Sequence, residues 1–313
     1  MDTIFKIDRL KLMFLITLAA CLFSQSGCGL AKKFIRPFPK EKKILTGGKN
    51  KRGGLFFRKG KEPVAEAEGE LKIIKRIEPE RDLVQLPFSP EEKLIYGVKW
   101  RGIPIGEIRL MVDGLYQLNN GRRVYRLVYE ASTNPLFDTV YKVRDQIVSY
   151  FDCQELIPWK TEKHLREGGY RRQEIIELDR ENNQAIYLTS QPLEIAEIKP
   201  GAQDILSCFY YYRTKDIETG KSERMFVFSD RKNWNLELKA LQKKRINTYL
   251  GKFDSILVAP EAKFRGVFFR KAKMQLYLKD DKSKIPLVIT AKRSFFGSIT
   301  ATLMRMDKKE EEI

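Results

Sequence analysis

The chain has 313 residues, a length that fits one large domain or two small ones. Its 59 basic and 41 acidic side chains leave a net charge of +18, a balance that often indicates nucleic-acid binding. The N-terminal segment nevertheless predicts export across a membrane, which argues against nucleic acid as a partner.

Residues 1–30 have the layout of a secretory signal peptide. Lys6, Arg9 and Lys11 precede an apolar run over 12–20. A transmembrane helix needs about 20 apolar residues, and the run reaches that length only if the polar residues that follow it are counted. We therefore expect a signal peptide and lipobox region at 1–30.

The end of the apolar run resembles the lipobox of bacterial lipoproteins. Leu18-Ala19-Ala20-Cys21 places small residues before a cysteine, and the resemblance implies that Cys21 is lipidated and becomes the mature N-terminus. Cys28 is the alternative, although Gln25 stands where an aliphatic residue is expected. Both could also be ordinary cysteines of the signal region. Because each buried CH₂ of a lipid chain contributes about 0.8 kcal/mol, acylation would hold the protein on the periplasmic side of the inner or the outer membrane.

A basic tether and linker is expected at 31–87. Between Lys32 and Lys61 the only acidic residue is Glu41, and two Gly-Gly pairs interrupt the segment. Such a composition cannot form a core. The tether is either solvated or lies on an anionic membrane surface, where each basic residue adds about 1 kcal/mol. From 62 to 82 the sequence is typical of a linker or a short helix.

Residues 88–306 predict an all-β, mainly antiparallel domain, followed by a charged tail at 307–313. Alternating apolar and polar residues indicate half-buried strands, with Gly168-Gly169 and Asn182-Asn183 as hairpin turns. Helical spacing of apolar residues appears once, over Gln203–Tyr212. We expect a large curved or barrel-like sheet around this single helix. The expected strands are 94–101, 108–112, 124–132, 139–151, 159–167, 170–178, 185–189, 224–229, 234–241, 244–249, 253–260, 273–278, 286–292 and 298–304.

No local motif predicts catalysis, a cofactor or a metal. The sequence lacks the common nucleophile, phosphate-loop and metal signatures, and its one histidine, His164, has no Cys or His near it in the sequence. Carboxylates could still converge from distant strands, as in glycosidases. Cys153 and Cys208 could form a disulfide in an oxidising compartment, or each could be a small buried side chain.

The domain resembles the bacterial exported proteins grouped as the domain of unknown function DUF3108. The resemblance runs from about 88 to 306, and it implies an envelope protein with a β-rich fold and no established activity. Within it, Asp204 is expected to cap the helix together with Ser207, and Arg213 is expected to pair with Asp145 or Asp152. The residues that carry the resemblance are Tyr96-Gly97-Val98-Lys99-Trp100, Gly102-Ile103-Pro104-Ile105-Gly106, Asp145, Ser149, Asp152, Leu156-Ile157-Pro158, Asp204-Ile205-Leu206-Ser207, Tyr210-Tyr211, Arg213, Val258-Ala259-Pro260, Leu278-Lys279-Asp280-Asp281 and Ile285-Pro286-Leu287-Val288-Ile289.

These patterns favour a non-enzymatic, lipid-anchored envelope protein that binds a hydrophobic ligand or an envelope component. The alternative is a scaffold that acts through protein contacts, and an unrecognised hydrolase comes third. The many aromatic residues either fill the core or line a concave apolar face. A carrier should contain a continuous apolar cavity, whereas a scaffold should have a filled core and an exposed apolar patch.

Overall fold

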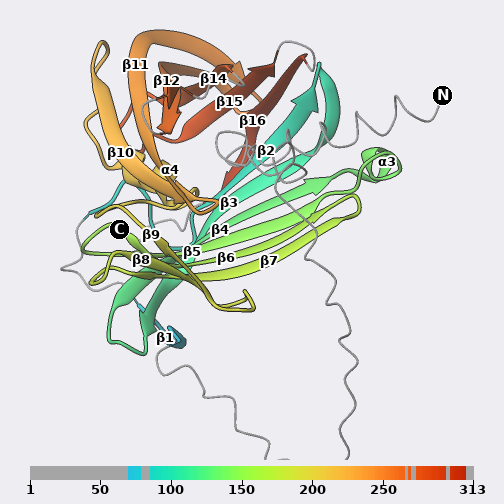
Figure 1. Ribbon diagram of the computed structural model, residues 1–313. Coiled ribbons are helices and arrows are strands. Elements are labelled where there is room, and N and C mark those ends of the chain that lie inside the picture. The colour runs from blue at the N-terminus through green and yellow to red at the C-terminus, as the bar shows by residue number, and fades with distance from the viewer. Residues whose placement is uncertain (1–69, 79–84, 265–266, 269–272, 294–296, 308–313) are drawn as a thin grey trace, which may run out of the picture. The chain divides into compact units, whose positions relative to one another are not determined.

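A computed structural model describes residues 70–78, 85–264, 267–268, 273–293 and 297–307 (Figure 1). All the described strands belong to one compact unit. The predicted signal region, with Cys21 and Cys28, lies outside the described residues, as do the tether up to residue 69 and the tail from 308.

The described elements are almost all strands, which confirms the predicted fold class. Two short helices, α3 (Pro135–Asp138) and α4 (Ser207–Arg213), interrupt them. The strands are β1 (Ile73–Ile77), β2 (Lys93–Trp100), β3 (Ile103–Leu118), β4 (Arg123–Thr133), β5 (Arg144–Asp152), β6 (Pro158–Glu167), β7 (Tyr170–Asp179), β8 (Gln184–Tyr187), β9 (Glu194–Glu197), β10 (Ser222–Ser229), β11 (Lys232–Thr248), β12 (Gly251–Phe264), β13 (Val267–Phe268), β14 (Lys273–Lys279), β15 (Pro286–Arg293) and β16 (Gly297–Asp307).

The strands form one antiparallel sheet that curves so that its two edge strands, β9 and β10, approach each other without pairing directly. The order runs from β10 through β11, β12, β14, β15, β16 and β2 to β9, and each strand is hydrogen-bonded to the next. After β9 the chain crosses to the opposite edge, where the Gln203 N–H donates to Phe226 O and the Phe228 N–H donates to Gln203 O, both at 2.8 Å. This crossing makes the sheet barrel-like.

The main core lies inside the curve, against α4 (Figure 1). It takes alternate residues of the strands, as the period-two pattern predicts. On β4, for example, Tyr125, Leu127 and Tyr129 belong to this core. Val124 and Val128 of the same strand point to the other face, where they join a smaller apolar cluster against which Leu71 packs. The central strands therefore bury both faces.

The turn between β2 and β3 is tighter than the sequence predicted. We expected a break over 102–106, but only Arg101 and Gly102 form the turn, with φ of 50° and 87°. Two residues with positive φ are what a two-residue hairpin requires. Gly106 lies within β3, where a Cβ atom would stand 2.1 Å from Ser132 O, so the glycine allows β4 to approach.

Two predicted strands, 234–241 and 244–249, are a single strand, β11. The register shifts between Ala240 and Gln242, which leaves Leu241 as a bulge with 47% of its surface exposed. A bulge moves the following side chains to the opposite face, and this change of phase separates the two predicted strands.

Some elements were not predicted. β1 lies in the segment expected to be a linker, but it pairs with β3, so the domain extends N-terminally beyond the predicted start at 88. Short strands β9 and β13 and helix α3 were also missed, since four or fewer residues carry little periodicity.

Candidate functional site

Helix α4 lies where the sheet closes, and Asp204 fixes its start. The Asp204 Oδ1 accepts hydrogen bonds from the backbone N–H groups of Leu206 at 2.8 Å and Ser207 at 2.7 Å. The Ser207 Oγ accepts from the Asp204 N–H at 2.9 Å, and the Thr161 hydroxyl donates to Asp204 Oδ2 at 2.7 Å. The helix proper begins at Ser207 with Leu206 in the capping position, later than the predicted start at 203, because the Asp204 turn takes up the residues before it.

The other end of α4 is held by a buried ion pair. The Arg213 guanidinium donates to both carboxylate oxygens of Glu92, at 2.6 and 2.9 Å, and to the carbonyls of Pro87 and Ser283. Burial disfavours its charge, but the hydrogen bonds to Glu92 more than offset this effect, and the pKa of Arg213 is raised. The predicted pairing of Arg213 with Asp145 or Asp152 is wrong.

The two expected partners have other roles. Asp152 ends β5, where its Oδ1 accepts from the backbone N–H groups of Gln154 and Glu155 at 2.8 Å. The Asp145 Oδ1 accepts from the Arg166 N–H at 2.8 Å. Both aspartates therefore cap backbone groups of the β5–β6 pair, and neither reaches α4.

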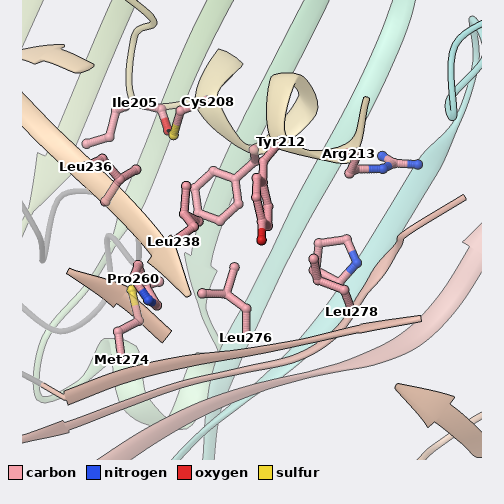
Figure 2. Close-up of a pocket in the computed structure, with 12 residues that line it drawn as sticks. Ile205, Cys208, Tyr212, Arg213, Leu236, Leu238, Pro260, Met274, Leu276 and Leu278 are labelled. Carbon is pink, nitrogen blue, oxygen red and sulfur yellow. Dashed lines mark hydrogen bonds between the residues drawn. The ribbon is translucent and has the colours of Figure 1, made fainter. Parts of the chain in front are cut away.

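Two apolar pockets lie on either side of α4, and Ile205 and Phe209 line both of them. The first pocket lies between α4 and the strands β11, β12, β14 and β15 (Figure 2). Figure 2 shows Tyr212 pointing from the helix toward Leu276, while Arg213 turns its guanidinium away. The lining residues are Ile205, Cys208, Phe209, Tyr212, Arg213, Leu236, Leu238, Pro260, Met274, Leu276, Leu278 and Pro286 in the first pocket, and Tyr96, Ile108, Leu110, Tyr129, Ile147, Ile205, Leu206, Phe209, Ile289 and Ala301 in the second.

Little free space remains in either pocket. The cavity volumes are about 30 and 20 Å³, whereas sites for small molecules have about 300 to 1,000 Å³. Phe209 is only partly buried although it packs against the core. In this conformation the interior is nearly filled, and the partly buried Phe209 lines both pockets.

The disulfide that the sequence allowed between Cys153 and Cys208 is not formed, since both residues are buried thiols. Cys208 lies on α4 and belongs to the main core, and its Sγ lies 3.2 Å from Ile205 O. Burial raises the pKa of the Cys208 thiol well above its ordinary value, so it remains neutral. Cys153 and Cys208 are therefore small buried side chains, which was the alternative expectation.

Sequence reasoning missed a buried carboxyl pair formed by Asp145 at the start of β5 and Glu167 at the end of β6. Asp145 and Glu167 are 3% and 5% exposed, and their carboxyl groups lie close enough to influence each other's ionisation. Burial, together with the negative charge of Asp145, raises the pKa of Glu167 to about 9; burial also raises the pKa of Asp145.

His164 lies half-buried on β6 and lines a polar groove of about 550 Å³ with residues of β3, β4 and β5. Charged side chains that line the groove form ion pairs, for example Arg109 with Glu107 and Arg144 with Asp138. Within the described residues, no three His, Cys, Asp or Glu side chains gather in a way that could hold a metal ion. Neither helix described is long and apolar enough to cross a membrane.

The fold and the site define an antiparallel β domain whose curved sheet closes around a short helix and encloses an apolar interior. The chain belongs to the family described as Protein of unknown function (DUF3108), whose model matches residues 95–304. The sequence matches none of the curated proteins with which it was compared.

The chain also matches solved structures with which it shares little sequence. A β-barrel-like protein of the domain of unknown function DUF1849 from Brucella abortus is 11% identical, with a TM-score of 0.49; the match covers 71% of this chain and 99% of that one. A chain described as a putative lipoprotein from Parabacteroides distasonis is 8% identical, with a TM-score of 0.29 and coverage of 71% and 97%. One described as a putative exported protein with a YmcC-like fold from Bacteroides fragilis is 8% identical, with a TM-score of 0.28 and coverage of 72% and 100%.

Proposed function

We propose that this protein is an exported, lipid-anchored envelope protein whose β domain binds a small hydrophobic ligand beside α4. The observation that carries the proposal is the pair of apolar pockets that share Phe209. The signal layout and Cys21 support the location, and a non-enzymatic role agrees with the absence of a local catalytic motif.

Ligand entry requires Phe209 to move, because the free volumes are too small for a ligand in the closed conformation. Its partial exposure and its position between two apolar spaces make this side chain the simplest gate. If it rotates out, the two pockets join into one apolar space under α4. The capped start and ion-paired end of the helix would keep the rest of the site in place.

An envelope scaffold remains the second candidate, favoured by the nearly filled core. A scaffold would bind partners through its surface and would carry no ligand in its interior. The two functions therefore differ in the contents of the purified protein.

The test uses the full chain purified from membranes, extracted for bound apolar molecules and then titrated with a fluorescent fatty acid. Phe209→Ala should raise the affinity for the probe by about tenfold, equivalent to about 1.4 kcal/mol, whereas Phe209→Trp should lower it by filling the space. Phe226→Ala on β10 is the matched control, because Phe226 is 41% exposed and lines neither pocket. Equal probe binding by all three variants, with no extractable ligand, would favour the scaffold.

A further inference from the structure

Figure 1 shows α3 at one end of the sheet. Exposed apolar side chains belong to α3 and to the residues on either side of the β2–β3 and β4–β5 connections. Ile103 is 58% exposed, Leu136 79% and Val140 66%. Half-buried Trp100 and Phe137 are close to them in the chain, and the two rings contact each other with centroids 6.4 Å apart in an edge-to-face arrangement. We call these five residues the α3 patch. An exposed apolar cluster of this kind marks an interaction surface.

The α3 patch is held in place by hydrogen bonds between neighbouring turns. The Asn134 Oδ1 caps α3 by accepting from the Phe137 N–H at 2.8 Å, and its Nδ2 donates to Pro104 O at 3.0 Å. On the other side, the Gly168 N–H of the β6–β7 turn donates to Lys142 O at 2.8 Å. The turns after β2, β4 and β6 thus form one preorganised tip.

The segments that carry the patch, and the adjoining β6–β7 turn, are rich in basic residues. The segments 99–104, 134–144 and 166–171 hold six basic residues and two acids. Of the acids, Asp138 is paired with Arg144, and Glu167 is buried and holds a proton up to a pKa of about 9. The basic residues are Lys99, Arg101, Lys142, Arg144, Arg166 and Arg171.

We propose that this tip docks on an anionic lipid bilayer, with Leu136, Val140 and Ile103 inserted into the interface and the basic residues on the headgroups. Apolar side chains on one side and cations around them are the combination that interfacial membrane binding requires. Trp100 suits the headgroup level, where tryptophan is enriched. The inference does not depend on a ligand beside α4.

A second exposed pair shows that apolar exposure alone does not make such a surface. Leu193 and Ile195, next to and on β9, are 56% and 53% exposed, but Glu194 and Glu197 accompany them. Acidic neighbours would be repelled by anionic lipid. This pair therefore provides the matched control for the α3 patch.

The test uses the full chain with Cys21→Ser and Cys28→Ser, so that acylation contributes nothing, and vesicles of phosphatidylcholine with or without about one third phosphatidylglycerol. Leu136→Asp with Val140→Asp should reduce binding to the anionic vesicles by about tenfold, whereas Leu193→Asp with Ile195→Asp should leave it unchanged. All variants keep the basic tether, so its contribution is the same in each. These substitutions lie at exposed positions, and thermal unfolding should confirm that the fold is retained.

Trp100 gives a second readout that the tether cannot produce. Trp159 and Trp234 are 8% and 1% exposed, so brominated lipid in the vesicles should quench mainly Trp100, and Trp100→Phe should abolish the quenching. Equal binding by the two aspartate pairs, or no quenching of Trp100, would overturn the proposal and leave the tether as the membrane contact or a protein as the partner of the patch.

Discussion

Arg213 shows how much of this domain depends on single polar residues placed in an apolar interior. Its guanidinium is enclosed by Glu92 and by the carbonyls of Pro87 and Ser283, and the Arg213 and Glu92 side chains are 3% and 0% exposed. Removing water from both charges is costly, and their bidentate hydrogen bonds offset that cost. The pair joins α4 to the residues just before β2, which are 121 positions away.

Breaking this pair should be strongly destabilising. Arg213→Met leaves the Glu92 carboxylate buried without its cation, and the free energy of unfolding should fall by about 3 to 5 kcal/mol. Denaturant unfolding of the full chain measures the loss. The double variant Glu92→Gln, Arg213→Met removes both charges and should recover part of the stability; if it is no more stable than Arg213→Met, the pair is not the cause.

At the scale of elements, α4 depends on its surroundings because seven residues are too few for a stable isolated helix. Asp204 satisfies two N–H groups at its start and accepts the Thr161 hydroxyl of β6. The sequence indicated this role from the spacing of Asp204 and Ser207. It placed the helix start too early, because a turn that precedes a helix shares its apolar spacing.

Asp204→Ala should lower the free energy of unfolding by about 2 to 3 kcal/mol, since it removes a cap and leaves buried donors without acceptors. Asp204→Asn keeps one side-chain oxygen and should lose less. Asp179 is the matched control: it caps the β7–β8 turn by accepting from Glu181 and Asn182 near the surface, so Asp179→Ala should cost less than about 1 kcal/mol. Chemical denaturation ranks the three, and equal losses at Asp204 and Asp179 would contradict the role of the buried cap.

At the scale of the whole molecule, charged side chains help to close the sheet. Arg231, in the turn between β10 and β11, donates to Glu174 of β7 at 3.1 Å and to Glu194 of β9 at 2.7 Å. Arg172 of β7 reaches Asp230 in the same turn at 3.1 Å. This network lies across the opening between the two edges, next to the backbone pairing of Gln203, and ties distant strands into one cooperative domain.

The Asp145–Glu167 pair should make the stability of the whole domain depend on pH. Folded Glu167 keeps its proton up to a pKa of about 9, against an ordinary value of 4.5, so between these values the folded state binds more protons than the unfolded state. The free energy of unfolding should therefore fall as the pH rises from about 5 to about 9, by at most about 1.4 kcal/mol per pH unit.

Thermal unfolding of the full chain between pH 5 and 9 measures this slope. Glu167→Gln cannot ionise and should flatten the profile, with its largest stabilisation relative to the parent at the alkaline end. Glu197→Gln is the control, because the Glu197 side chain is 77% exposed and should leave the slope unchanged. A Glu167→Gln profile as steep as that of the parent would rule out this pair as the source.

The sequence by itself determined the features that depend on near neighbours along the chain. Period-two burial predicted most strands, and the glycine and asparagine pairs predicted the β6–β7 and β7–β8 turns. The spacing of Asp204 and Ser207 predicted that Asp204 accepts backbone N–H groups near the helix start, although the capping position itself is Leu206. The order of the short sequence motifs from Tyr96 to Ile289 indicated the family, and the family comparison confirms it.

Only the tertiary structure decided which distant side chains meet. The Glu92 partner of Arg213, the carboxyl pair, the bulge at Leu241 and the closure at Gln203 follow from strand register and sheet curvature. Both are set by packing summed over the whole sheet, and no single stretch of sequence records them. The α3 patch has the same origin, because two connections far apart in the chain become one surface only when β2 to β5 align.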